Sequence, residues 1–429
     1  MMIDQEILQI AADLLRHEDA EVREQSALLQ GSFALSGIGR QIFDFAFENL
    51  KELLEDNELN VREAASWALY RMSVNEDGCQ RLVQGGIPEF MILSFIRASE
   101  PKDVQAEDSQ YLIHLLEAFV NITFSDTGIE TLLGKDAIKQ FNKIIGPQAP
   151  IEKLGDSFPK IAELCLRVIG NMSINHTGKE ECIEHQVIAT CFKYLALSEE
   201  RSYEDALNTS LILMSTSIAL EGKNQIVDQV NEANDPVIIQ TIISRLESEE
   251  FPDLRNNLKV ALTNVAELPR GFEEITRQLL TKIAILDEVF GARSVKPLHN
   301  FLPKLSEYNE MLDQCPKLMS DWAPWSQVIE ALAFLFQKYK EDAAQVAMDE
   351  TINFSEKLAP FINPKFGVQN KVFICLAEIL SIDAYNCHIM QKFIAKYGDL
   401  PVNNKTLKHE MFQECHEIFE LAMEARIMT

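Results

Sequence analysis

The chain has 429 residues, of which 47% are apolar, so it can fold into two or more domains or a repeat array. It carries 39 lysines and arginines against 66 aspartates and glutamates, a formal net charge of −27, and no run of basic residues. Such a surface repels phosphate backbones and anionic lipids, so we expect neither nucleic acid nor a membrane as partner.

The beginning of the chain, MMIDQEILQIAADLLRHEDAEVRE, has neither a basic start nor a long apolar core, so it does not look like a signal peptide. No segment approaches about 18 consecutive apolar residues, which predicts no transmembrane helix. The eight cysteines are scattered along the chain, which favours reduced thiols in a cytosolic compartment.

An internal repeat is indicated by segments that align without gaps: ASWALYRMSVNEDGCQRL, LLEAFVNITFSDTGIETL, CLRVIGNMSINHTGKEEC, SLILMSTSIALEGKNQI and KVALTNVAELPRGFEEI. The aligned position holds Arg71, Asn121, Asn171, Ser215 and Asn264. Seven residues later every segment has a glycine, namely Gly78, Gly128, Gly178, Gly222 and Gly271. These glycines lie 50, 50, 44 and 49 residues apart. Gly39 marks a weaker first copy, and Asn386 takes the glycine position of a degenerate later one.

The residues around the aligned position have the periodicity of a helix that is interrupted at the glycine and then resumes. Small residues lie two positions after it, namely Ser73, Thr123, Ser173, Ser217 and Ala266. We expect a helix to end near each glycine, whose free φ lets the chain reverse. We expect Asn121, Asn171 and Asn264 to be structural and largely buried, with their amides bonded to nearby backbone.

The stretch GNMSINHTGKEECIEHQVI, residues 170–188, permits three other interpretations. Its two N-x-[ST] sequons matter only on the secretory route. The Gly178-Lys179 pair lacks the spacing of a phosphate-binding loop. His176, Cys182, His185 and Cys191 lack the paired spacing of a zinc site, and Cys182 occupies a position that is apolar in the other copies. We therefore expect no glycosylation, no metal and no cofactor.

These patterns predict an all-α fold, an armadillo/HEAT-like right-handed α-solenoid with a helical C-terminal extension. The predicted domains are the repeat array, 1–290, and the extension, 291–429, which continues or caps the solenoid. Residues 408–428 form an amphipathic helix whose apolar face either caps the array or binds a partner. The candidate partner face consists of Phe412, Ile418 and Phe419.

The pattern Ala-Leu-x-Asn-[Leu/Ile/Met]-Ser, followed by a glycine and an apolar helix pair, resembles the armadillo repeat. Three longer segments, 47–87, 164–188 and 258–275, look like the radial spoke head 14 homologue family, and the similarity runs over most of residues 20–290. The resemblance implies a non-enzymatic scaffold of the ciliary axoneme, docked among other radial spoke proteins of a motile cilium. The extension is longer than the family leads us to expect.

Other functions are weighed against this one. The acidic surface favours a partner that presents basic segments. A transport adaptor of the importin alpha type would carry Trp and Asn one turn apart, but Trp67 is followed by Arg71, and Asn121 is preceded by Glu117. A regulator of a cytosolic machine, such as a chaperone or exchange factor, stays an alternative because no motif separates it from a scaffold. The sequence contains no G-x-S-x-G, H-E-x-x-H or dinucleotide motif, so we expect no catalytic residues and no enzyme activity.

Overall fold

The computed structural model describes residues 5–279 with gaps at 101–105, 147–148, 150, 196–202, 230–236 and 249–250, and also residues 285, 288–289, 332–334 and 338. The chain divides into two units, Met1–Val265 and Ala266–Thr429. The described secondary structure is entirely helical, with no strand in these residues, which confirms the expected all-α solenoid. The predicted boundary at residue 290 and the residues Phe412, Ile418 and Phe419 lie outside the described part, as does the extension apart from residues 332–334 and 338.

The helices of unit 1 recur in the order short first helix, second helix and long third helix. The third helices are α2 (Ala20–Phe33), α5 (Leu59–Ser73), α8 (Ser109–Ile122), α12 (Phe158–Ser173), α15 (Tyr203–Thr216) and α18 (Pro252–Val265). The first helices are α3 (Gly37–Ile42), α6 (Glu76–Gln84), α9 (Asp126–Leu133), α13 (His176–Glu184) and α16 (Leu220–Asp228). The second helices are α4 (Phe47–Leu53), α7 (Ile87–Ala98), α10 (Ala137–Ile145), α14 (Val187–Leu195) and α17 (Val237–Ser248).

The remaining described elements are short or lie at the ends of the array. Helix α1 (Gln5–Asp13) precedes α2, and α11 (Ile151–Leu154) lies between α10 and α12. Single 3-10 turns span Leu14–Arg16, Phe43–Ala46, Ala106–Asp108 and Gly155–Ser157. Helix α19 (Pro269–Leu279) belongs to unit 2 and is a first helix by its place in the sequence repeat. No helix in the described residues has the length and apolarity to cross a bilayer.

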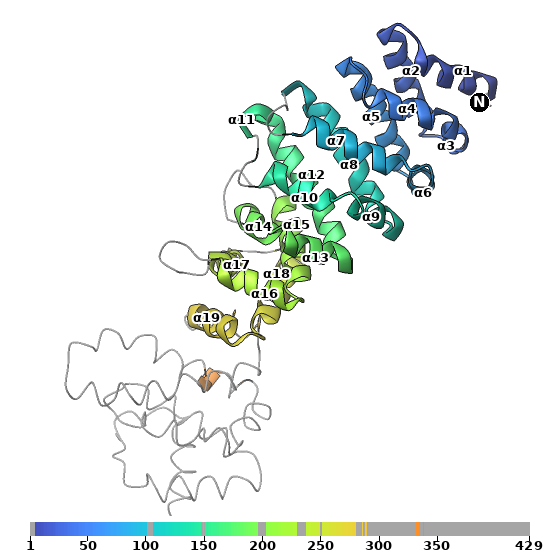
Figure 1. Ribbon diagram of the computed structural model, residues 1–429. Helices are drawn as coiled ribbons and strands as arrows, with labels where there is room; N and C mark the ends of the chain where they lie inside the picture. The colour runs from blue at the N-terminus through green and yellow to red at the C-terminus, as the bar shows by residue number, and fades with distance from the viewer. Residues whose placement is uncertain are drawn as a thin grey trace, which may run out of the picture. The chain divides into compact units, whose positions relative to one another are not determined.

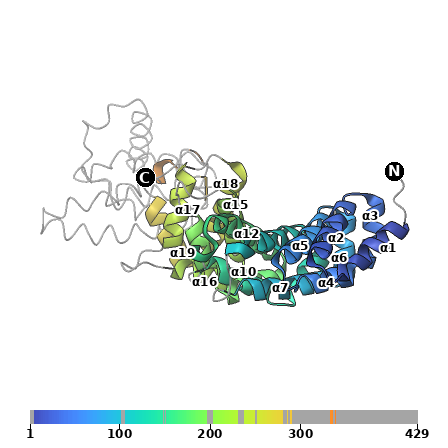
Figure 2. The ribbon, with the colours of Figure 1, turned by 90° about the horizontal axis from the view of Figure 1, so that it is seen from above.

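Each third helix packs against the neighbouring third helices, so that these helices form one layer of unit 1 (Figure 1). Figure 2 shows α5, α12, α15 and α18 along one side of the unit and α4, α7, α10 and α16 along the other. Third helices need small residues because they have neighbours on both sides: Ala65 and Ala68 of α5 are fully buried, and Gly31 of α2 lies against Trp67.

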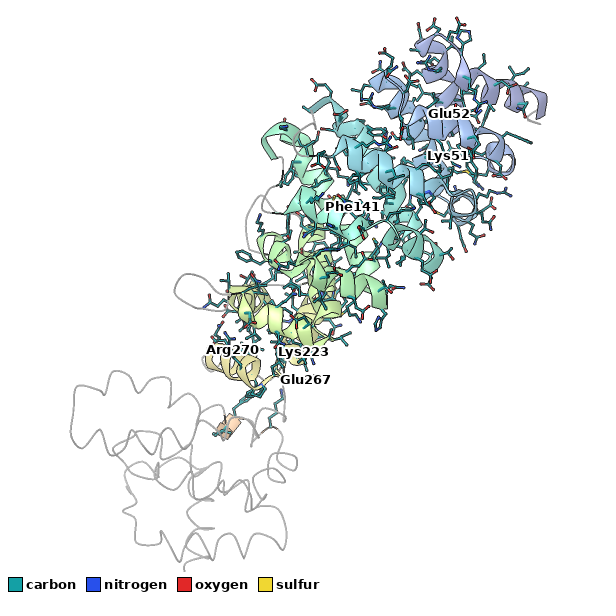
Figure 3. The ribbon with its side chains drawn as sticks, in the orientation of Figure 1. Lys51, Glu52, Phe141, Lys223, Glu267 and Arg270 are labelled. Carbon is teal, nitrogen blue, oxygen red and sulfur yellow. The ribbon has the colours of Figure 1, made fainter. Side chains whose placement is uncertain are left out.

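Large side chains fill the space between the two layers. Phe141 of α10, labelled in Figure 3, packs against Phe95 of α7 and Phe119 of α8, with ring centroids 5.2 and 5.7 Å away. Buried tyrosines bind the ends of second helices in the preceding repeat: the Tyr111 hydroxyl donates to the Leu54 carbonyl at 3.1 Å, and the Tyr194 hydroxyl to the Ile145 carbonyl at 2.8 Å. A buried hydroxyl without a hydrogen bond would lower the stability of the fold, and these bonds give each of the two hydroxyls a partner.

The repeat glycines do not end helices, so that expectation is wrong. Gly78, Gly128, Gly178, Gly222 and Gly271 are each the third residue of a first helix. The first four have no positive φ. A Cβ atom would instead lie 1.8 Å from the Met72 carbonyl oxygen at Gly78 and 2.0 Å from the Met172 carbonyl oxygen at Gly178. The glycines are needed because the first helix begins against the carbonyl groups that end the third helix.

Three of the four left-handed residues in the described part lie at another turn, between the first and second helices; the fourth, Gly155, begins the 3-10 turn before α12. Gly86, Asp136 and Gln186 have φ values of 66°, 54° and 55°, and each directly precedes a second helix. They lie 50 residues apart, at one position of the repeat. Only one of the three is a glycine, so the sequence pattern did not reveal this turn.

Candidate protein-interaction surface

A ladder of side-chain hydrogen bonds joins successive third helices. The Nδ2 amides of Asn121, Asn171 and Asn264 donate at 3.0 Å to the hydroxyls of Ser73, Thr123 and Ser217, respectively. Each bond reaches back 47 or 48 residues, into the preceding repeat. The expectation of a largely buried amide bonded to nearby backbone is therefore wrong, because these asparagines are half-buried and bind a neighbouring repeat.

The accepting hydroxyls are themselves tied to the ends of their own helices. The Ser73 hydroxyl donates to the Tyr70 carbonyl at 2.7 Å, and the Thr123 hydroxyl to the Val120 carbonyl at 2.8 Å. This explains the small residue two positions after the aligned asparagine: its hydroxyl accepts from the next repeat and donates to its own helix. We call each such connection a rung.

Two junctions depart from this pattern. Between α12 and α15 the rung is a hydroxyl pair, in which Ser215 donates to Ser173 at 2.8 Å. At the first junction the position of the acceptor is taken by Ala34, which has no hydroxyl, and Arg71 replaces asparagine. The Arg71 guanidinium lies over the ring of Trp67 instead, 5.4 Å from its centroid.

The outward-facing residues of the third helices lie four apart and share one face of each helix. We call them the outer row: Glu24, Glu63, Trp67, Arg71, Glu117, Asn121, Glu163, Arg167, Asn171, Leu207 and Leu211, all of them half-buried. The part from α2 to α12 is rich in carboxylates, whereas α15 contributes leucines. The row therefore offers charge at one end and apolar surface at the other.

Carboxylates on neighbouring third helices interact within the outer row. Burial raises the pKa of Glu63, and nearby Asp108 and Glu24 raise it further against the opposing effect of Arg62. Burial likewise raises the pKa of Glu117, with Glu163 adding to the effect and Lys160 opposing it. Two neighbouring carboxylates attract a cation placed between them.

Aromatic rings lie beside these carboxylates. Tyr70 of α5 and His114 of α8 stack with centroids 6.4 Å apart and planes 1° from parallel. Burial lowers the pKa of His114, so its ring adds no positive charge near neutral pH. Trp67 is covered by Arg71 and Tyr70 by His114, so both rings have a stacking partner within the protein.

The residues once considered as metal ligands are not brought together as a set. Cys182 and Cys191 are fully buried, which raises the pKa of both thiols, and Cys182 is the small apolar core residue that its position predicts. His176 is exposed and lies 3.4 Å from Glu180. No group of three or more His, Cys, Asp or Glu side chains in the described residues is arranged to hold a metal. The absence of a bound metal in the protein stays a prediction.

The second sequon has a structural cause. Asn175 is the N-cap of α13, and its side chain accepts a hydrogen bond of 3.0 Å from the Thr177 amide. In the first sequon, Asn171 and Ser173 both belong to rungs. Local helix-end chemistry and inter-repeat bonding thus account for both patterns.

Comparison with known proteins adds to the assignment of the fold. An engineered protein of known crystal structure is similar with a TM-score of 0.53 at 16% identity, over 97% of this chain and 99% of that one. This likeness agrees with the three-helix repeat seen in the described residues. The fold is an armadillo-like α-solenoid.

Designed armadillo-repeat proteins are also similar in structure. One, designed for modular peptide recognition, has a TM-score of 0.48 at 17% identity over 60% of this chain and 99% of its own. Another, in complex with the peptide (KR)4, has a TM-score of 0.47 at 17% identity over 60% and 99%. No family model matches the armadillo-like chain, and no curated protein matches it in sequence.

Proposed function

We propose that this protein is a non-enzymatic scaffold that binds a basic segment of a partner protein along the outer row. The observation that carries the proposal is the set of half-buried carboxylates that neighbouring third helices present in the outer row, Glu24, Glu63, Glu117 and Glu163. A basic segment laid across these carboxylates would relieve their repulsion, and solenoids bind through such extended surfaces.

The finer proposal concerns the place of the scaffold. Its support is the resemblance of residues 47–87, 164–188 and 258–275 to the radial spoke head 14 homologue family. We place the protein in the axoneme of a motile cilium, where it contacts other radial spoke proteins. A tagged copy expressed in ciliated cells should remain on the axoneme after extraction with detergent. A signal that is uniformly cytosolic or nuclear would refute the spoke assignment and leave the binding surface to be tested separately.

Binding along the outer row can be measured with a fluorescent extended peptide of alternating Lys and Gly. Glu63→Gln, Glu117→Gln and Glu163→Gln combined should weaken its binding at least tenfold. A control variant with the same loss of charge away from the row, Glu48→Gln, Glu52→Gln and Glu130→Gln, should bind nearly as the wild type does. Equal weakening in both variants would mean that net charge alone attracts the peptide.

A further inference from the structure

An apolar ridge runs along unit 1 beside the outer row, from which it differs in its residues. It consists of one large side chain per repeat, three positions after the aligned residue: Leu35, Val74, Phe124, Ile174 and Ile218. These side chains are between 50% and 70% exposed, although each directly follows a buried helix end. A scattered exposed apolar residue is ordinary, but the same position in five successive repeats is a continuous feature of the array.

Neighbouring ridge residues are connected through the stacking of their repeats. The rungs of Asn121 and Asn171, both 3.0 Å long, lie at the junctions from Val74 to Phe124 and from Phe124 to Ile174, and the Ser215–Ser173 rung lies at the junction from Ile174 to Ile218. Packed helices lie roughly 8–10 Å apart, which sets the approximate distance between successive ridge residues.

The distance between successive ridge residues is close to the heptad spacing of an α-helix. Residues seven apart in an α-helix lie on one face and are separated by about 10.5 Å. An extended strand returns to one face every second residue, about 6.6 Å on, and so misses successive ridge residues. A helix with an apolar residue at every seventh position can place one of them at each repeat.

The charges beside the ridge indicate which side chains a partner helix would carry on either side of its apolar face. The first helices that follow the ridge residues carry exposed acids in their first turns, namely Glu76, Asp77, Asp126 and Glu221. His176 is at the equivalent place of α13. The cations of this strip are Arg40 and Arg81, each close to Asp77, and Lys179 and Lys223. These four cations are half-buried or buried, whereas the four acids are exposed, so a partner with basic flanks is favoured.

We propose that the apolar ridge is a docking site for a basic amphipathic α-helix of a partner protein. The helix would lie along the ridge, with apolar residues at heptad spacing against Val74, Phe124, Ile174 and Ile218 and lysine or arginine beside the acidic first turns. The site consists of residues that are not members of the outer row, and it lies beside that row because each ridge residue follows the aligned residue by three positions.

The test uses the full-length protein and a fluorescent helical peptide of four heptads, with Leu at the positions that face the ridge and Lys on the flanks. Phe124→Ser, Ile174→Ser and Ile218→Ser combined should weaken its binding at least tenfold. The matched control replaces exposed apolar residues elsewhere, Phe45→Ser, Phe90→Ser and Leu93→Ser, and should bind as the wild type does. Thermal unfolding of both variants checks that the fold is retained.

Three outcomes would overturn the proposal. The first is failure of the helical peptide to bind the wild type, or equal binding of a scrambled peptide with the same composition. The second is preference of the ridge for a proline-rich extended peptide or for lipid vesicles. The third is a change of oligomeric state in the ridge variant with unchanged peptide binding, which would make the ridge a contact between copies. The outer-row variant should bind the helical peptide normally, so the two proposals can fail independently.

Discussion

Asn171 of α12 donates a 3.0 Å hydrogen bond to the hydroxyl of Thr123, which ends α8 48 residues earlier. The bond joins two repeats through side chains, whereas the Thr123 hydroxyl also binds the backbone of its own helix. The Thr123 hydroxyl thus connects the end of α8 to α12 in the next repeat.

Removal of this rung should lower stability. Asn171→Ala is expected to reduce the free energy of unfolding by about 1–2 kcal/mol, because a half-buried hydrogen bond is lost. Thr123→Val should cost a similar amount, and the double variant should cost less than the sum, since both changes remove the same bond. Urea denaturation of the four proteins measures the coupling, and strictly additive effects would show that the bond contributes nothing.

The repeat glycine should not tolerate a methyl group. Gly178→Ala would place a Cβ 2.0 Å from the Met172 carbonyl oxygen, so the first helix must shift, at a cost of about 2–4 kcal/mol. Gly134→Ala is the control, because its nearest neighbour is 3.5 Å away and its φ is −58°. We expect that change to stay within about 0.5 kcal/mol. Similar losses in both variants, measured by thermal unfolding, would contradict the steric explanation.

The left-handed turn before the second helices gives a pair of opposite effects. Gln186 has a φ of 55°, which is unfavourable for a residue with a Cβ, so Gln186→Gly should stabilise the protein by about 0.5–1 kcal/mol. Gly86 has a φ of 66° and open space around it, so Gly86→Ala should destabilise it by about 1 kcal/mol through the backbone alone. Chemical denaturation should show that the two changes shift the free energy of unfolding in opposite directions. A loss of stability in the Gln186 variant would contradict the claim that the left-handed φ is unfavourable at this position.

Glu181 should make stability depend on pH. Burial, with Asp136 and Glu184 nearby, raises the pKa of Glu181 to about 7, and its Oε2 is buried without a hydrogen bond. The folded protein therefore holds this proton more tightly than the unfolded chain, whose ordinary glutamate pKa is about 4.5. The resulting stability is fully present below about pH 4.5 and is lost as the pH rises through about 7.

Glu181→Gln removes that titration. Between about pH 4.5 and 7 the variant should lose less stability than the wild type, and near pH 8 it should be more stable by about 1–2 kcal/mol, allowing for partial solvent screening. Glu63 and Glu117, whose pKa values are also raised, remain in both proteins and cancel in the comparison. Parallel curves of unfolding free energy against pH would show that Glu181 titrates normally.

The repeat itself was accessible from the sequence, because helical periodicity and the spacing of the glycines are local properties. The reason for each glycine was not, since it depends on how closely a helix start approaches the end of the helix before it. The aligned asparagines and the small residues two positions on were both recognised, but their pairing joins residues from different repeats. Only the stacking of the third helices brings Asn171 to Thr123 rather than to its own backbone.

The candidate surfaces show the same division. Glu63, Trp67 and Arg71 lie four apart, so a shared helix face could have been inferred for the outer row. Which face of a third helix is exposed depends on the neighbouring helices, so it could not be inferred from the sequence. The apolar ridge was hidden because an apolar residue near a helix end predicts burial, whereas Phe124 and Ile174 are exposed. Residues 408–428 lie outside the described part, so their role stays a prediction.

The rungs also bear on how such a chain can evolve. Removing residues 74–123 would delete one complete repeat and join Ser73 to Phe124. Asn171 would then meet the Ser73 hydroxyl in place of Thr123, and Gly128 would meet the Met72 carbonyl in place of that of Ile122. Duplication of the same block would be accommodated in the same way. Gain or loss of a whole repeat therefore brings two different helices together but still places an asparagine at a hydroxyl and a glycine at a carbonyl, so the gene can change the length of the array while these two contacts are kept.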